Sequence, residues 1–219
     1  MLLHISGAPV SLHIGNRDKL FVLFSSDIAR AYPVNEWDAT EASVITIGVN
    51  DWNHMLSPWK APACFPSGEE FSGGADEFLE KVLNRILPEA ERAAGLTGAY
   101  RAACGYSLAG LFSLYAITKT NFFQSAASVS GSLWFDGFPE YLLSHPPVRS
   151  DCSVYLSLGD REAKVRNARL KAVGDNTQAA FRFYQSVCRR TIYEVNPGNH
   201  FENPEGRMLR AMNWLLHNA

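Results

Sequence analysis

Short apolar runs rich in β-branched residues alternate along this chain with longer segments of helical period. The runs that resemble strands are Leu20–Phe24, Ser43–Val49, Tyr100–Cys104, Ala126–Ser130, Ser153–Leu158 and Thr191–Asn196. Most of them are almost continuously apolar, which is typical of strands that are covered on both faces. Strands and helices that alternate in this way form βαβ units. The pattern therefore predicts an α/β fold with a mostly parallel sheet and helices on both of its faces.

The segments between these runs predict helices. From Ala75 to Ala94 the apolar residues recur every three or four positions, as they do on one face of a helix, and Pro88 should kink that helix. Further helices are expected directly after Ser107, over Asp175–Cys188 and over Pro204–His217. No repeat, low-complexity tract or Gly/Ser-rich linker marks a boundary, so we interpret residues 1–219 as one domain.

Composition argues against several classes of protein. The 219 residues are 47% hydrophobic, and their 20 Lys and Arg residues are scattered and balanced by 22 Asp and Glu residues. Nucleic-acid binding needs clustered basic residues, so no nucleic-acid partner is expected. No apolar run approaches the roughly 18 residues of a membrane-spanning helix, and the first residues lack the features of a secretory signal. We therefore expect a cytoplasmic protein without a membrane partner.

The cysteines also favour a cytoplasmic location. They lie far apart along the chain and form no CxxC pair: Cys64, Cys104, Cys152 and Cys188. This spacing predicts neither a zinc site nor a redox motif, and free thiols fit a reducing compartment.

The strongest local motif is GYSLAG, residues 105–110, which lies between an apolar strand and a helical segment. In a nucleophile elbow, a serine sits on a sharp strand-to-helix turn whose neighbours two positions away must be very small. Gly105 and Ala109 meet that demand around Ser107. An ordinary helix-capping serine is the alternative, so the choice depends on whether a base and an acid are available.

Among the six histidines, His200 is the best candidate for the base. It follows the strand Thr191–Asn196 through a Pro-Gly-Asn turn and precedes the last helix, whereas the others lie in loops or near the ends of the chain. That position is at the carboxyl edge of a parallel sheet, the edge at which Ser107 is expected. A turn histidine next to the last helix is the structural alternative.

Two carboxylates compete to orient this histidine. The chain order of an α/β-hydrolase places the acid between the serine and the histidine. After the strand Ser153–Leu158 the sequence reads Gly-Asp-Arg-Glu, which offers Asp160 at the strand end and Glu162 further into the loop. The spacing alone leaves both open, and the unused carboxylate could form a surface ion pair with Arg161.

An oxyanion needs two backbone donors near the serine. The N–H group of Leu108 is one candidate, and the N–H group of Asn50 or Asp51, in the loop after an early strand, is the other. Trp134, after the strand Ala126–Ser130, is a candidate for substrate contact, although buried packing is the commoner role of such a residue.

Four blocks of sequence resemble the putative-esterase family of α/β-hydrolases, whose members include siderophore esterases, S-formylglutathione hydrolases and feruloyl esterases. The blocks are DWNHMLSPWKAP with FSGGADEFLE, GYSLAGLFSLYA, SGSLWFDGF and SLGDREAK. The resemblance implies an α/β-hydrolase fold and a serine esterase with Ser107 as nucleophile and His200 as base. It also favours Glu162 over Asp160 as the acid, because relatives place the acid three residues after the strand-end glycine. Many of those relatives have Asp at the acid position, and this chain also lacks the length for a lid domain.

The expected activity is hydrolysis of a small carboxylic ester through an acyl-enzyme, with no metal or organic cofactor. Two alternatives use the same residues differently. An acyltransferase would pass the acyl group to an alcohol or sugar, and a non-catalytic scaffold would keep the fold for binding alone.

Overall fold

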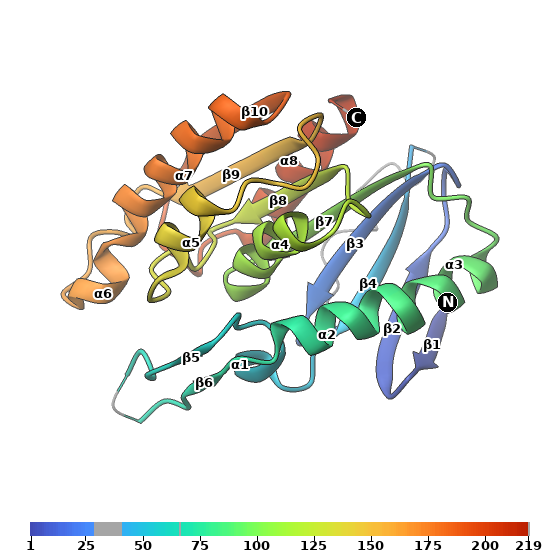
Figure 1. Ribbon diagram of the computed structural model, residues 1–219, viewed down its shortest axis with the longest axis horizontal. Coiled ribbons are helices and arrows are strands. Elements are labelled where there is room, and N and C mark those ends of the chain that lie inside the picture. The colour runs from blue at the N-terminus through green and yellow to red at the C-terminus, as the bar shows by residue number, and fades with distance from the viewer. Residues whose placement is uncertain (29–40, 66, 219) are drawn as a thin grey trace.

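The computed structural model describes residues 1–28, 41–65 and 67–218 of the chain (Figure 1). Its main element is an eight-stranded sheet of order β1-β2-β4-β3-β7-β8-β9-β10. The strands are β1 (Leu2–Ile5), β2 (Ala8–His13), β3 (Lys19–Ser25), β4 (Ser43–Gly48), β7 (Tyr100–Tyr106), β8 (Ser125–Val129), β9 (Ser153–Gly159) and β10 (Arg190–Asn196). All neighbours from β4 to β10 in this order are parallel, whereas β1 and β2 are antiparallel. The mostly parallel sheet is thus confirmed.

The helices cover both faces of the sheet, as the sequence predicts. They are α1 (Trp52–Met55), α2 (Ala75–Lys81), the π-helix η1 (Val82–Ile86), α3 (Leu87–Ala94), α4 (Leu108–Lys119), α5 (Phe138–Ser144), α6 (Ala168–Lys171), α7 (Val173–Val187) and α8 (Pro204–His217). A small hairpin of β5 (Lys60–Ala61) and β6 (Phe71–Ser72) projects beside α1 (Figure 1). We continue to interpret residues 1–219 as one domain, since strands from both halves of the chain build one sheet.

Alternate residues of β3 show how the two faces are buried. Leu20, Val22 and Phe24 belong to the larger apolar core, which α2, α3, α4, α5 and α7 complete. Phe21 and Leu23 point to the other face and join a second core with α8. Because side chains alternate along a strand, a run without polar residues must be covered on both sides.

The first strand expected from the sequence is Leu20–Phe24, but two strands precede it. They are β1 and β2, which form a hairpin and contain His4 and His13. The turn at Ser6 and Gly7 has two positive φ angles, +52° and +79°, as a tight hairpin turn requires. The runs on either side are short and only partly buried, so their apolar signal is weak.

The kink expected at Pro88 takes the form of a π-helical turn. The helix continues from α2 through η1 into α3, and Pro88 occupies the first turn of α3. Proline lacks an N–H group and crowds the preceding turn, and a π-turn can accommodate both effects without ending the helix.

The connection from β8 to β9 contains α5 and no lid domain over residues 130–152, all of which the structure describes. The region above the carboxyl end of β8 is therefore built from short loops.

Candidate functional site

Ser107 lies on the turn between β7 and α4 and has an unusual backbone conformation, with φ +59° and ψ −123°. A Cβ atom added at Gly105 would lie 2.2 Å from the carbonyl carbon and oxygen of Ala109. Only glycine fits this crossing of strand and helix. The GYSLAG segment therefore has the strand–turn–helix conformation of a nucleophile elbow, which exposes the hydroxyl at the carboxyl edge of the sheet.

The loop from β10 to α8 brings His200 to this serine. Its Nε2 atom lies 3.1 Å from Ser107 Oγ, which is hydrogen-bond distance across 93 positions of sequence. The hydroxyl of Tyr106, the residue before the serine, donates a 2.6 Å hydrogen bond to the His200 carbonyl oxygen. The loop and the elbow are thus joined through both side chain and backbone.

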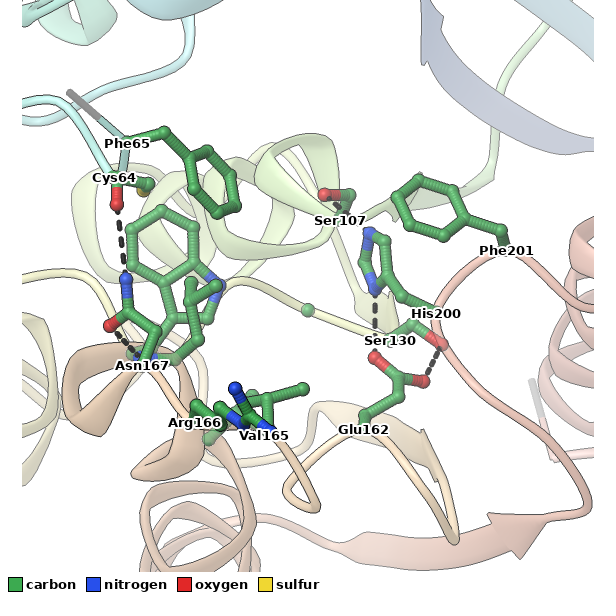
Figure 2. Close-up of a pocket in the computed structure, with 14 residues that line it drawn as sticks. Cys64, Phe65, Ser107, Ser130, Glu162, Val165, Arg166, Asn167, His200 and Phe201 are labelled. Carbon is green, nitrogen blue, oxygen red and sulfur yellow. Dashed lines mark hydrogen bonds and ion pairs between the residues drawn. The ribbon is translucent and has the colours of Figure 1, made fainter. Parts of the chain in front are cut away.

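Glu162 completes the arrangement on the other side of the imidazole. Its Oε2 atom lies 2.8 Å from His200 Nδ1, while Oε1 accepts hydrogen bonds from Ser130 Oγ and the Gly159 N–H group. Burial opposes ionisation of this carboxylate, but the hydrogen bonds from His200 and Gly159 outweigh it and hold its pKa below the ordinary value. The carboxylate is therefore ionised at neutral pH and can orient the imidazole (Figure 2).

Asp160, the competing acid, has another partner. Its Oδ1 atom accepts a 2.8 Å hydrogen bond from the Gly198 N–H group, and its side chain is half exposed. Arg161 pairs mainly with Glu202 at 2.7 Å, and its Nε atom is 4.0 Å from Asp160. Of the two carboxylates that the sequence left open, Glu162 is the one in contact with His200.

The expected oxyanion donors lie on two neighbouring segments. Leu108 is the first residue of α4, where an N–H group has no acceptor inside the helix. Asn50 and Asp51 are exposed and follow β4, and the Asp51 side chain caps α1 by accepting from the His54 N–H group. A cavity of about 220 Å³ beside Ser107 is lined by Leu108 and by Trp52, the residue after Asp51. The donor role of Asn50 or Asp51 stays a prediction.

A larger cavity of about 690 Å³ is lined by Ser107 and His200 and shares part of its lining with the smaller one. Trp134 lines both cavities and packs against Phe71 and under the guanidinium of Arg169, 5.2 Å from its ring. Phe65 and Phe201 lie on either side of the serine (Figure 2) and are 58% and 86% exposed. Large exposed aromatic side chains around a cleft are typical of ligand-binding surfaces.

The sequence of this chain matches a known protein family. A family model described as "Putative esterase" matches residues 27–208. The chain belongs to this family. Membership in this esterase family supports a hydrolase that acts on esters.

One curated protein is also similar in sequence to this chain. Uncharacterized protein YbbA of Bacillus subtilis (strain 168) is 26% identical over 130 residues, which are 57% of this chain and 52% of YbbA. The match thus spans about half of that relative.

Solved structures share the α/β-hydrolase fold of this esterase-family chain. Siderophore hydrolase EstA from Aspergillus nidulans superposes with a TM-score of 0.77 at 18% identity, over 97% of this chain and 90% of EstA. An IroE-like serine hydrolase from Shewanella oneidensis gives a TM-score of 0.75 at 14% identity, over 96% and 75% of the two chains. At these identities the similarity establishes the fold.

Two further observations concern metals and membranes. Among the residues that the structure describes, no cluster of three His, Cys, Asp or Glu side chains could hold a metal ion. Within the same residues, no helix combines the length and the apolar composition needed to cross a bilayer.

Sequence reasoning missed three residues that contact the Glu162–His200 pair. Tyr106 was in the motif but had no role, and Ser130 has a positive φ of +46° just after β8. Arg207 is completely buried on α8, with one guanidinium nitrogen 2.9 Å from Glu162 Oε1. A signal existed for this arginine: it falls four positions before Ala211 on the apolar face of the predicted last helix.

Proposed function

We propose that this chain is a serine esterase that hydrolyses a carboxylic ester through an acyl-enzyme. The observation that supports it best is the continuous chain of hydrogen bonds from Ser107 Oγ through the imidazole of His200 to Glu162. A serine hydroxyl is a poor nucleophile until a base takes its proton, and here a base lies within 3.1 Å.

In the acylation step, Ser107 Oγ attacks the ester carbonyl carbon while His200 Nε2 accepts the hydroxyl proton. The buried carboxylate of Glu162 accepts from Nδ1–H, fixes the tautomer and stabilises the imidazolium. The negative charge moves to the carbonyl oxygen, where the N–H group of Leu108 and a second donor at Asn50 or Asp51 would bind it. The intermediate then expels the alcohol, which takes the proton from His200.

Deacylation repeats these steps with water in place of serine. His200 removes a proton from the water, the hydroxide attacks the acyl carbon, and Ser107 leaves with the proton that His200 returns. The products are the carboxylic acid and the free enzyme.

The two cavities support a substrate with unequal halves. The larger cavity, whose lining includes Trp134, Leu170 and Val173, would take an apolar or aromatic group, with Trp134 as one wall. The smaller cavity lies near Leu108, on the side of the expected oxyanion donors. The cytoplasmic location expected from the sequence remains part of this proposal.

The experiment that tests the function is the Ser107→Ala variant. We expect it to abolish both turnover of a short-chain p-nitrophenyl ester and labelling by a fluorophosphonate probe. Asn176→Ala, which removes a side-chain hydrogen bond to the Leu133 carbonyl oxygen, is a control that should keep both signals. Persistent labelling of Ser107→Ala would refute the assignment of the nucleophile.

A further inference from the structure

Arg207 contacts Glu162 and the backbone of the loop that carries His200, from a fully buried position. One terminal nitrogen, Nη1, donates to Glu162 Oε1 and to Ser130 Oγ, each at 2.9 Å. The other, Nη2, donates to the carbonyl oxygens of Pro197 and Asn199, at 2.9 and 3.0 Å. These two carbonyls belong to the loop that holds His200.

We propose that Arg207 is a positioning residue that fixes the carboxylate of Glu162 and the backbone of the His200 loop relative to each other. This inference rests on the proposed function, because it concerns the same triad. The planar guanidinium presents its donors in a rigid fork, so a single side chain can hold a carboxylate on one side and two carbonyls on the other.

A contribution to folding stability alone does not explain why an arginine occupies position 207. Burying a guanidinium is energetically unfavourable, and apolar replacements of buried ion pairs are often neutral or stabilising. Arg207 lies next to Met208 and one turn before Ala211, positions of α8 that pack in the second apolar core. Its Nε atom has no hydrogen-bond partner among the described residues. The site thus accepts an incompletely compensated charge where an apolar residue could pack.

The charge of Arg207 also has an electrostatic consequence. His200 uses Oε2 of Glu162, while Arg207 uses Oε1, so one carboxylate serves two cations once the imidazole is protonated. The guanidinium therefore reduces the stabilisation that Glu162 gives the imidazolium. Removing the positive charge should shift protonation of the imidazole to higher pH.

Other titratable groups lie near Glu162 and His200. Tyr106 faces the loop backbone, and Tyr193 on β10 is close enough for the Glu162 charge to contribute to its raised pKa, after burial. The remaining charges near the loop are Asp160, Arg161 and Glu202 on the exposed side, and Arg210, which contacts Asn196 where the loop begins. None of them changes in the variants below, so a difference between variants reports on Arg207.

The test compares Arg207→Met, which removes charge and fork, with Arg207→Lys, which keeps the charge and loses the fork. Both should lower kcat by about 10- to 100-fold with KM changed much less, because misplacement of catalytic groups acts on the chemical step. Only Arg207→Met should shift the pH dependence, by about one pH unit towards higher pH. The shift should be seen in the acidic limb of the kcat/KM profile and in the midpoint of the His200 imidazole titration followed by NMR. Arg182→Met, which removes an exposed positive charge on α7, is the control and should match the wild type.

Two results would overturn the proposal: kcat within twofold of the wild type in both folded variants, or a His200 titration unchanged in Arg207→Met. If Arg207→Met does not fold, the kcat of Arg207→Lys decides the question. The NMR titration needs no turnover. A wild-type protein without esterase activity would therefore sink the proposed function, while the Arg207 inference would still be tested by the imidazole.

Discussion

The carboxylate of Asp160 accepts a 2.8 Å hydrogen bond from the N–H group of Gly198, which lies two residues before His200 in the chain. It supports the backbone of the loop, whereas Glu162 contacts the imidazole itself. We expect Glu162→Gln to reduce kcat about 10²- to 10⁴-fold, because the amide no longer fixes the tautomer or stabilises the imidazolium.

The matched variant for this test is Asp160→Asn, whose side-chain oxygen can still accept from Gly198. Its kcat should stay within about threefold of the wild type, as expected for an exposed side chain outside the proton path. Steady-state kinetics on one p-nitrophenyl ester compares the two variants. A larger loss in Asp160→Asn than in Glu162→Gln would reverse the assignment of the acid.

Stability should depend on pH through Glu162. Its pKa is lower in the folded state than the ordinary value of 4.5, so the unfolded chain binds more protons as the pH falls. The stabilisation is complete above pH 4.5 and is lost as the pH drops through the folded pKa. Urea unfolding between pH 7 and 3 should therefore show a steeper loss of unfolding free energy in the wild type than in Glu162→Gln.

Ser107→Ala keeps the carboxylate and is the control for this pH experiment. Its curve should run parallel to that of the wild type. Asp151, whose pKa is lowered by hydrogen bonds from Arg149, is present in every variant and cancels in the comparison. Parallel curves for the wild type and Glu162→Gln would contradict the prediction.

Gly105→Ala should disrupt the elbow. The added methyl group would lie 2.2 Å from backbone atoms of Ala109, and backbone cannot move aside as a flexible side chain can. We expect destabilisation of about 3 kcal/mol or more, or failure to fold, measured by urea denaturation. Gly174→Ala, near the start of α7 with its closest contact at 3.1 Å to Ala163 Cβ, should change the free energy of unfolding by about 1 kcal/mol or less.

Filling the larger cavity should select against bulky substrates. Leu170 lines that cavity, and Leu170→Trp would occupy space needed by a long acyl or aryl group. We expect kcat/KM for p-nitrophenyl octanoate to fall about tenfold relative to p-nitrophenyl acetate, since a pocket discriminates by roughly 1–3 kcal/mol per displaced group.

Leu143→Trp serves as the control for this selectivity, because Leu143 is half exposed on α5. Its acetate-to-octanoate ratio should equal that of the wild type. An unchanged ratio in Leu170→Trp would mean that the larger cavity does not receive the substrate.

The parts of the fold that sequence predicted best are the fully buried ones. β3, β4 and β9 are covered on both faces, so their apolar runs stand out from the surrounding chain. β1 and β2 are short and only partly buried, and the signal of their hairpin was a two-residue turn rather than a hydrophobic run. β10, the strand at the other edge, is also partly exposed, but it was predicted from a longer run of residues that favour strands.

In the candidate site, sequence order located Ser107 and His200, since each follows a predicted strand at the same edge. It left the choice between Asp160 and Glu162 to a family resemblance, because a turn of three residues can direct either side chain to the imidazole. The helical period could have indicated that Arg207 is buried, but it does not identify its partners, which lie after β8, after β9 and in the His200 loop.

Among the described helices, α8 packs on the face of the sheet opposite α4, and it also supplies Arg207 (Figure 1). The packing that buries the second core also brings Arg207 to Glu162 and to the His200 loop. If Arg207 has the proposed role, a chain in which α8 has not yet packed on the sheet would lack a fixed acid–base pair.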